Sequence, residues 1–238
     1  ILRIVGTVWG YYIKRRINVK ATSFKVFRNL ESKELNKEQL DILLNEKDIV
    51  SQFDNNSIRE IAMQSVALMN SNGGCLLFGL KSNGKINGVD PDSCLALLNE
   101  AYTNCISIEF NPEVEKIILG RHIILKVILK KSNILSKFIN EKGMASTLYR
   151  LEGSTIRGNG YLDRLWFLRN GKIASMGIED DHILVGVIAD TDFISYNKLR
   201  KLSGLTFDQM DIVLSELIYK EIIQIRLLDE GLYFGLVK

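Results

Sequence analysis

The sequence predicts an α+β protein in which a mixed-sheet domain is followed by a small domain of three helices and a β-hairpin. Up to about residue 175, helical patterns alternate with hairpin patterns, which is typical of an α+β domain with a mixed sheet. From about residue 180, three short helical patterns precede two strands around a turn. We therefore divide the 238 residues into an N-terminal extension over 1–44, a sheet domain over 45–175 and a helical domain over 181–238.

Hydrophobic spacing predicts the first elements of the sheet domain. Apolar residues at helical spacing predict a helix over 34–45, and a longer helix that Asn55-Asn56-Ser57 caps and the Asn70–Gly74 cluster ends. The short apolar run Cys75–Leu80 predicts a buried central strand. The remaining predicted elements are a return strand over 86–89 after a turn over 82–85, a helix over 91–106, a hairpin formed by 115–118 and 122–129, a strand over 144–151 that Gly158-Asn159-Gly160 breaks, and a helix over 162–169.

The last part of the chain predicts a winged helix-turn-helix arrangement, because three helices close on a β-hairpin. The predicted third helix carries acidic residues that phosphates repel, and the basic residues lie on the second helix. We therefore favour a role in homodimer formation, packing or partner binding over reading a DNA groove. The helices are predicted over 182–189, 195–202 and 207–219, and the strands over 222–227 and 232–237. The acidic residues of the third helix are Asp208, Asp211 and Glu216, and the basic residues of the second are Lys198, Arg200 and Lys201.

Charge is unevenly distributed along the chain. The formal net charge is +3, yet residues 181–238 hold nine acidic and six basic residues, which leaves +6 for residues 1–180. Between Pro112 and Arg169 there are eleven basic and five acidic residues. A basic middle is compatible with a polyanionic partner, and the alternative is an ordinary solvated surface.

The segment Tyr149-Arg150-Leu151-Glu152-Gly153-Ser154-Thr155-Ile156-Arg157 is predicted to be a strand that enters a small, hydroxyl-rich, basic loop. Arginines and hydroxyls offer several donors to one phosphodiester, whereas the alternative is a polar loop with incidental arginines. The residues predicted to contact nucleic acid are Lys81, Lys85, Lys130, Lys131, Arg150, Ser154, Thr155, Arg157 and Arg164.

Several chemical classes are disfavoured by the sequence. Asn72-Gly73-Gly74 follows a helix and precedes a strand, which is the reverse of a phosphate-binding loop, so we interpret it as a helix cap and tight turn. No nucleophile with a base and no metal-ligand spacing stands out, so we expect no enzyme activity, no metal and no cofactor. The apolar run Ile1–Ile13 contains Arg3, is too short to span a bilayer and has no cleavage site, so we expect no membrane partner; the run is open to interpretation as the stump of a longer segment, an opening strand or an unusual start. Three cysteines without paired spacing fit a reducing compartment, so we expect a cytoplasmic protein.

The run from Ile61 to Val89 resembles the Schlafen-type AlbA-like domain, through its alanine-containing helix, Asn72-Gly73-Gly74, the strand that ends in Gly79, and Gly84 to Val89. The segment Tyr149 to Thr155 is similar to that family's closing Tyr-x-Arg-x-Gly-Ser-x-Thr signature, with Arg150 shifted by one position, and Ile117 to Val127 matches as well. The resemblance covers about residues 45–170 and points to prokaryotic members of the RecG-like and transcriptional-regulator type, in which a winged helix commonly follows.

This resemblance implies nucleic-acid binding, with DNA favoured over RNA, in a transcriptional regulator. Animal Schlafen members use the fold as an endoribonuclease with three acidic residues. The counterpart of their Glu-Phe-Lys motif here is Gln52-Phe53-Asp54, and Lys81 and Ser82 stand where the third acid belongs. Our leading hypothesis is therefore a DNA-binding protein without catalysis. The alternatives are a metal-dependent endoribonuclease that acts on structured RNA and a protein-interaction module.

Overall fold

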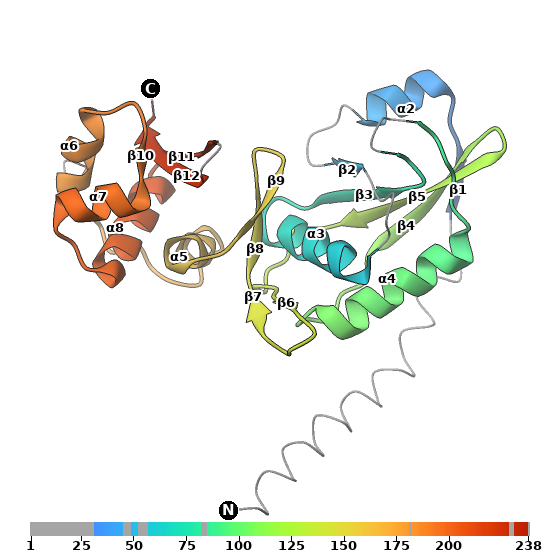
Figure 1. Ribbon diagram of the computed structural model, residues 1–238, viewed down its shortest axis with the longest axis horizontal. Helices are drawn as coiled ribbons and strands as arrows, with labels where there is room; N and C mark the ends of the chain where they lie inside the picture. Colours follow the sequence, from blue (N-terminus) through green and yellow to red (C-terminus); the bar gives the residue numbers. More distant parts are fainter. Residues whose placement is uncertain are drawn as a thin grey trace, which may run out of the picture. The chain divides into compact units, whose positions relative to one another are not determined.

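The computed structural model describes residues 31–44, 49–51, 57–81, 85–180, 182–228 and 231–237. The predictions for Ile1–Ile13, Gln52-Phe53-Asp54 and the turn at Ser82-Asn83-Gly84 lie outside these residues. The chain divides into two compact units, with the boundary between Ser146 and Thr147. We call them the first and second unit and describe each by itself (Figure 1).

The first unit is built on a five-stranded sheet. Parallel pairs join β1 to β4 and β2 to β3, whereas β5 is antiparallel to both β3 and β4. The predicted mixed sheet is thus confirmed, and the mixed α+β class with it. In sheet order the strands are β1 (Glu31–Glu34), β4 (Glu113–Leu119), β5 (His122–Leu129), β3 (Gly74–Phe78) and β2 (Ile49–Ser51).

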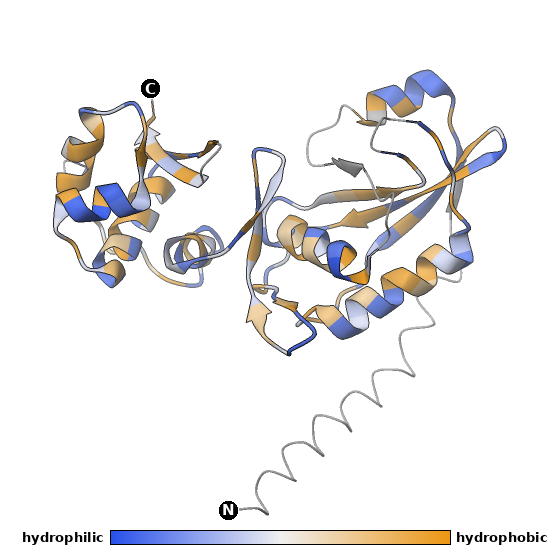
Figure 2. Ribbon diagram, viewed as in Figure 1, coloured by the Kyte–Doolittle hydropathy of each residue, from blue (hydrophilic) through white to orange (hydrophobic). Residues whose placement is uncertain are grey.

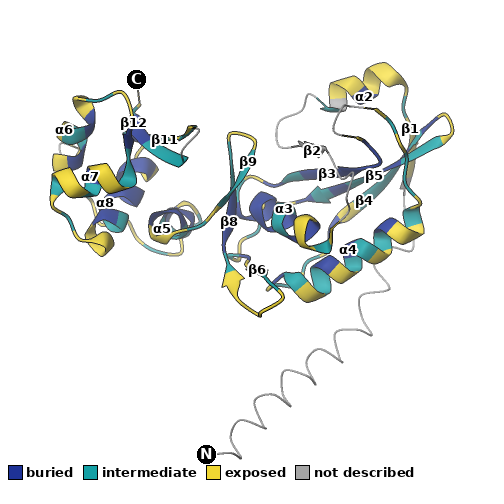
Figure 3. Ribbon diagram, in the orientation of Figure 1, coloured by how far each residue is buried: buried dark blue, intermediate teal, exposed yellow. Residues whose placement is uncertain are grey.

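Helices cover both faces of this sheet. On one face, α2 (Lys37–Leu44) inserts Leu40 among Leu77, Ile117 and Ile124. On the other, α3 (Ile58–Asn70) and α4 (Pro91–Cys105) lie against each other. The central strand β3 is therefore apolar and buried from Cys75 to Phe78, whereas its neighbour β5 combines buried and half-buried residues (Figures 2 and 3). This burial on two sides explains why β3 has a continuous apolar sequence.

Local signals fix the two ends of α3. Ser57 caps its start, because its hydroxyl accepts a hydrogen bond from the Glu60 amide at 3.1 Å. At its end, the Gly73 amide donates to the Leu68 carbonyl at 2.9 Å, and Gly73 has φ +81°. A Cβ on Gly73 would lie 2.6 Å from the Leu129 carbonyl oxygen. The glycine turn is therefore architectural, since only glycine lets the chain turn this close to β5.

Three predicted elements of this part of the chain differ in the structure. The predicted 34–45 helix starts only at Lys37, because Glu31–Glu34 pairs with β4 as a strand. The predicted return strand over 86–89 is a single bridge between Leu80 and Ile86, since the next two amides turn back to the Gly79 carbonyl. The predicted strand over 144–151 is divided into β7 (Ala145–Ser146), which pairs with β6 (Phe138–Ile139), and β8 (Leu148–Leu151).

The second unit begins with a hairpin and ends with a small sheet. The helices and the final hairpin predicted for this region are present, but β10 was not predicted. Strand β12 lies between β10 and β11 and is antiparallel to both. The elements are β8, β9 (Ser154–Arg157), α5 (Gly160–Arg169), α6 (Ile183–Ala189), β10 (Ile194–Ser195), α7 (Tyr196–Ser203), α8 (Phe207–Tyr219), β11 (Ile223–Leu228) and β12 (Gly231–Leu236).

Helix α8 is the core helix of the second unit. It packs against α5 and β11, and its residues from Val213 to Ile218 are all buried. A capping box begins this helix. The Thr206 hydroxyl accepts a hydrogen bond from the Gln209 amide, and Gln209 Oε1 accepts one from the Thr206 amide. Among the residues that the structure describes, no helix has the length and apolar character that crossing a membrane requires.

Candidate nucleic-acid interface

The basic segment around Arg150 is a β-hairpin. Residues Ser154–Arg157 were predicted to be a loop, but they form β9, which pairs with β8 in antiparallel register. Arg150 of β8 pairs with Thr155 of β9, and Leu148 of β8 pairs with Arg157 of β9. Residues two positions apart on a strand lie on the same face, so Arg150, Thr155 and Arg157 share one face of the hairpin. Ser154 pairs with Leu151 and lies on the opposite face. The register thus brings three of the predicted contact residues together and separates the fourth.

Arg150 is held in place on this face by its cross-strand neighbour. Its guanidinium donates a hydrogen bond from Nη1 to Thr155 Oγ1 at 3.1 Å. Arg150 and Thr155 are half-buried, whereas Arg157 at the end of β9 is exposed. A guanidinium has five N–H donors in a fixed fork. The face therefore presents an ordered arginine, a hydroxyl and an exposed arginine side by side.

A two-residue turn closes the hairpin and is fixed to the final sheet. Glu152 and Gly153 both have positive φ, at 48° and 78°, as a type I′ turn requires. The Glu152 carboxylate accepts hydrogen bonds from the Leu227 amide and from Arg226 Nη1, both at 3.0 Å. The Leu227 amide first, and then Arg226, hold the pKa of Glu152 below its usual value. These bonds offset the strain of a non-glycine residue in the left-handed region.

The other end of the hairpin is fixed to α5. Asp163 Oδ1 accepts hydrogen bonds from Tyr149 at 2.8 Å and from Thr147 at 2.7 Å. Burial, and then the neighbouring Asp163, raise the pKa of the Tyr149 phenol, so it remains a proton donor. The hairpin therefore has carboxylate anchors at both ends, which hold its basic face in a fixed shape.

Arg164 has a different environment from the other predicted contacts. It forms an ion pair with Glu216 of α8 at 3.3 Å, and the Glu216 side chain is fully buried. Burial alone would raise the pKa of Glu216, but hydrogen bonds from Ser175, Met176 and Arg164 outweigh it and hold the pKa below its usual value. Arg164 thus joins α5 to α8, and we leave it out of the candidate interface.

The four predicted lysines fall in the first unit, in two separate places. Lys130 and Lys131 follow β5 beside Gly73, whereas Lys81 and Lys85 come after the opposite end of β3. All four are exposed, and Lys130 forms an ion pair with Glu113. The lysines therefore form two pairs at opposite ends of a central strand.

Several acidic residues in the described part of the chain have local structural roles. No group of three His, Cys, Asp or Glu side chains that could hold a metal ion occurs among the described residues. Asp90 caps α4, where hydrogen bonds from Ser93 lower its pKa. Tyr196 donates a hydrogen bond to Asp211 at 2.8 Å, and Asp208 is exposed. Of the three acids on α8, two are therefore engaged inside the second unit.

Sequence reasoning missed the carboxylates that organise the interface. Glu152, Asp163 and Glu216 were not recognised as anchors, because their partners are 14 to 75 residues away in sequence. A short-range signal existed only for the turn. Glu152-Gly153 between two alternating segments is compatible with a two-residue hairpin loop.

Comparison with known proteins shows the family of this chain. A family model described as Schlafen, AlbA_2 matches residues 36–158, just over half of the chain. No curated protein matches it. A similar solved structure is the DIP2311 protein from Corynebacterium diphtheriae, with 15% identity and a TM-score of 0.39; the match covers 85% of this chain and 39% of that one. The chain belongs to the Schlafen AlbA_2 family, which is associated with nucleic-acid binding.

Proposed function

We propose that the protein binds DNA through its sugar-phosphate backbone, catalyses no reaction of its own and acts as a transcriptional regulator. The observation that carries this proposal is the anchored hairpin face with Arg150, Thr155 and Arg157. Charge-assisted hydrogen bonds from arginine and a neighbouring hydroxyl suit phosphate oxygens. The anchors at Glu152 and Asp163 lower the entropy cost of ordering this face on binding.

The remaining predicted contacts have secondary roles in this proposal. Ser154 would reach a phosphate only from the opposite face of the hairpin. The two lysine pairs of the first unit would add contacts that do not depend on sequence, because an ammonium group is a point charge without a fixed fork. The surface ion pair of Lys130 with Glu113 is no obstacle, because exposed pairs contribute about 0–1 kcal/mol.

We further propose that α6, α7, α8 and the β11–β12 hairpin form a winged helix used for assembly or partner binding. The order of these elements and the added strand β10 support this assignment. The buried run on α8 argues against its insertion into a DNA groove, because packing against α5 and β11 already occupies it. Helix α7 exposes Lys198 and Lys201, and Arg200 stacks 4.1 Å above the Phe207 ring.

The choice of DNA over RNA, and of regulation as the role, rests on the resemblance to DNA-binding regulators of this family. A direct test is fluorescence anisotropy with labelled duplex DNA, single-stranded DNA and duplex RNA at several salt concentrations. We expect the affinity for duplex DNA to be the highest and to fall linearly with salt on a double-logarithmic plot.

Variants locate the binding surface. Arg157→Ala is expected to weaken binding by about 5- to 10-fold at low salt and to reduce the salt slope by about 1. Adding Arg150→Ala should weaken it further. Lys172→Ala, which removes an exposed charge beyond α5, should leave affinity nearly unchanged. The proposal fails if no nucleic acid binds at low salt, or if the arginine variants match the Lys172→Ala control. Cleavage of structured RNA with Mg²⁺ or Mn²⁺ would favour the endoribonuclease instead.

A further inference from the structure

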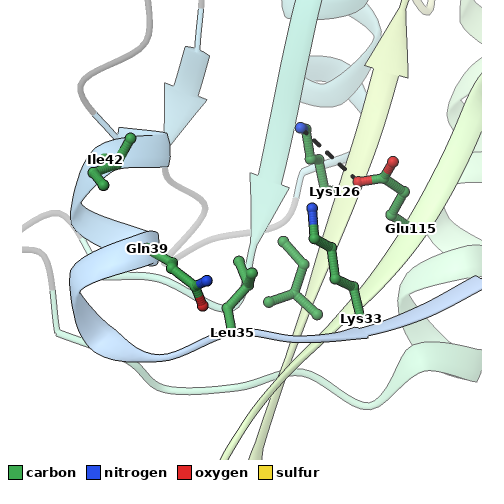
Figure 4. A pocket seen from close by; sticks show the side chains of 7 residues that line it. Lys33, Leu35, Gln39, Ile42, Glu115 and Lys126 are labelled. Atoms are coloured by element: carbon green, nitrogen blue, oxygen red, sulfur yellow. Dashed lines mark ion pairs between the residues drawn. The ribbon is translucent and has the colours of Figure 1, made fainter.

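An open cavity of about 230 Å³ lies in the first unit between α2 and the strands β1, β4 and β5 (Figure 4). Drug-sized ligands occupy pockets of about 300–1,000 Å³, so this cavity suits a smaller molecule. Its lining combines apolar side chains with two cations, one carboxylate and one amide. The lining residues are Lys33, Leu35, Gln39, Ile42, Glu115, Ile117 and Lys126.

Strand register places the charged residues on one face of the sheet. Lys33 of β1 is opposite Ile117 of β4. Glu115, two positions before Ile117 on β4, is opposite Lys126 of β5. Residues at i and i+2 of a strand share a face. Figure 4 shows Lys33 extending towards the side of the cavity where Lys126 and Glu115 lie. Two ammonium groups thus face one carboxylate.

The positive charge at the cavity is incompletely satisfied. Lys126 has a side chain only 19% exposed, and its ion pair with Glu115 spans 3.9 Å, which is too long for a hydrogen bond. Lys126 Nζ keeps accessible surface, since it is not among the buried polar atoms without a partner, so its ammonium group opens on the cavity. The lining of the cavity holds two lysines and one glutamate among the described residues, which gives it a net charge of +1. This excess positive charge favours an additional anion.

Apolar and amide groups complete the cavity. Ile117 is 1% exposed, and Leu35 packs on the same core cluster, so together they form an apolar floor. Ile42 of α2 is 68% exposed and offers apolar surface at the opening. Gln39 Oε1 accepts a hydrogen bond from the Asn36 amide at 2.9 Å, which leaves its NH₂ group as a donor.

We propose that this cavity binds a small organic anion, with its carboxylate or phosphate head between Lys33 and Lys126 and its apolar body on Leu35, Ile42 and Ile117. Gln39 would donate a further hydrogen bond to the head group. The apolar floor and the small volume distinguish this site from a surface that follows a nucleic-acid backbone. The proposal stands on the first unit alone and does not depend on DNA binding.

Titration of the ¹⁵N-labelled full chain by two-dimensional NMR tests the site, with benzoate and phenyl phosphate as probes and benzyl alcohol as the neutral control. We expect saturable shifts of the amides of Leu35, Gln39, Ile117 and Lys126 with at least one anion, and much weaker binding of benzyl alcohol. The tighter of the two anions identifies the head group. Equal affinity for the alcohol, or shifts spread over surface lysines without saturation, would overturn the proposal.

Variants test the charges individually. Lys126→Met and Lys33→Met should each weaken the binding of the anion about tenfold, as loss of a charged hydrogen bond does. Glu115→Gln should strengthen anion binding several-fold, because the substitution removes the competing carboxylate. If Glu115 had only a structural role, this gain in affinity would not occur. Lys116→Met is the matched control, since Lys116 is adjacent to Glu115 but on the other face of β4. Lys33 is exposed on an edge strand, so its variant decides the outcome if Lys126→Met disturbs the fold. Unchanged affinity in both lysine variants would refute the site.

Discussion

Replacing Arg164 by leucine should strongly destabilise the second unit. The fully buried Glu216 accepts hydrogen bonds from Ser175 Oγ at 2.5 Å, the Met176 amide at 3.0 Å and Arg164 Nη2 at 3.3 Å. Arg164→Leu leaves this carboxylate with two neutral donors and no opposite charge. Removal of one partner of a buried pair costs about 3–5 kcal/mol. Because two donors remain and the Arg164 bond is long, we expect a loss of about 3 kcal/mol.

The size of this loss should depend on pH. Hydrogen bonds hold the pKa of Glu216 below its usual value in the folded wild type, so its stabilising contribution is present above the unfolded pKa and is lost as pH falls through the folded pKa. In the Arg164→Leu variant the isolated carboxyl can relieve its buried charge by taking up a proton. The difference between the two proteins should therefore be greatest near neutral pH and narrow on acidification.

Urea unfolding followed by the fluorescence of Trp166, which is buried on α5, measures this difference. A Trp9→Phe background leaves Trp166 as the single tryptophan. Lys172→Leu is the control for loss of an exposed positive charge and should change the free energy of unfolding by less than about 0.5 kcal/mol. The double variant Arg164→Leu/Glu216→Leu should recover much of the loss, since no unpaired charge remains. A loss below about 1 kcal/mol, or one independent of pH, would refute the reasoning.

Three further perturbations follow from the described contacts. Gly73→Ala should lower the free energy of unfolding by about 3 kcal/mol because of its positive φ and the backbone clash, whereas Gly171→Ala, with positive φ but open space, should lose about 1 kcal/mol; equal losses would contradict the clash. Asp163→Asn removes the charged acceptor of Tyr149 and should speed amide hydrogen exchange across the hairpin, and unchanged protection would argue against this anchor. Acidification through the lowered pKa of Glu152 should release its bonds to β11, visible as pH-dependent NMR shifts of the β11 amides; their absence would contradict the tether.

Elements with strong local signals were predictable from sequence. The capped and glycine-ended α3, the apolar β3 and the β4–β5 hairpin around Gly120 each depend on neighbours close in the chain. The edge strand β1 was not predictable, because its sequence is Glu-Ser-Lys-Glu and its partner β4 lies about 80 residues away. Parallel pairing at an exposed edge leaves no apolar alternation to read.

The candidate interface was predictable in composition but not in arrangement. Arg150, Thr155 and Arg157 could be chosen from their residue types, yet only the register of β8 and β9 puts them on one face. Arg164 is of the same residue type, and its pairing with Glu216 depends on how α5 packs on α8. A basic residue in sequence therefore indicates a contact only when no buried carboxylate is near it in the fold.

The separation of the two lysine pairs sets the length of nucleic acid that can contact both. Lys81 lies seven residues beyond Gly74, and Gly74 pairs with Leu129, which Lys130 follows. At about 3.3 Å per residue a fully extended stretch of this length would measure roughly 23 Å, and the turn at Gly79 shortens it. A duplex rises about 3.4 Å per base pair, so the two pairs are at most about seven base pairs apart. Shorter oligonucleotides would reach one pair at a time, and affinity would increase with probe length until this span is covered.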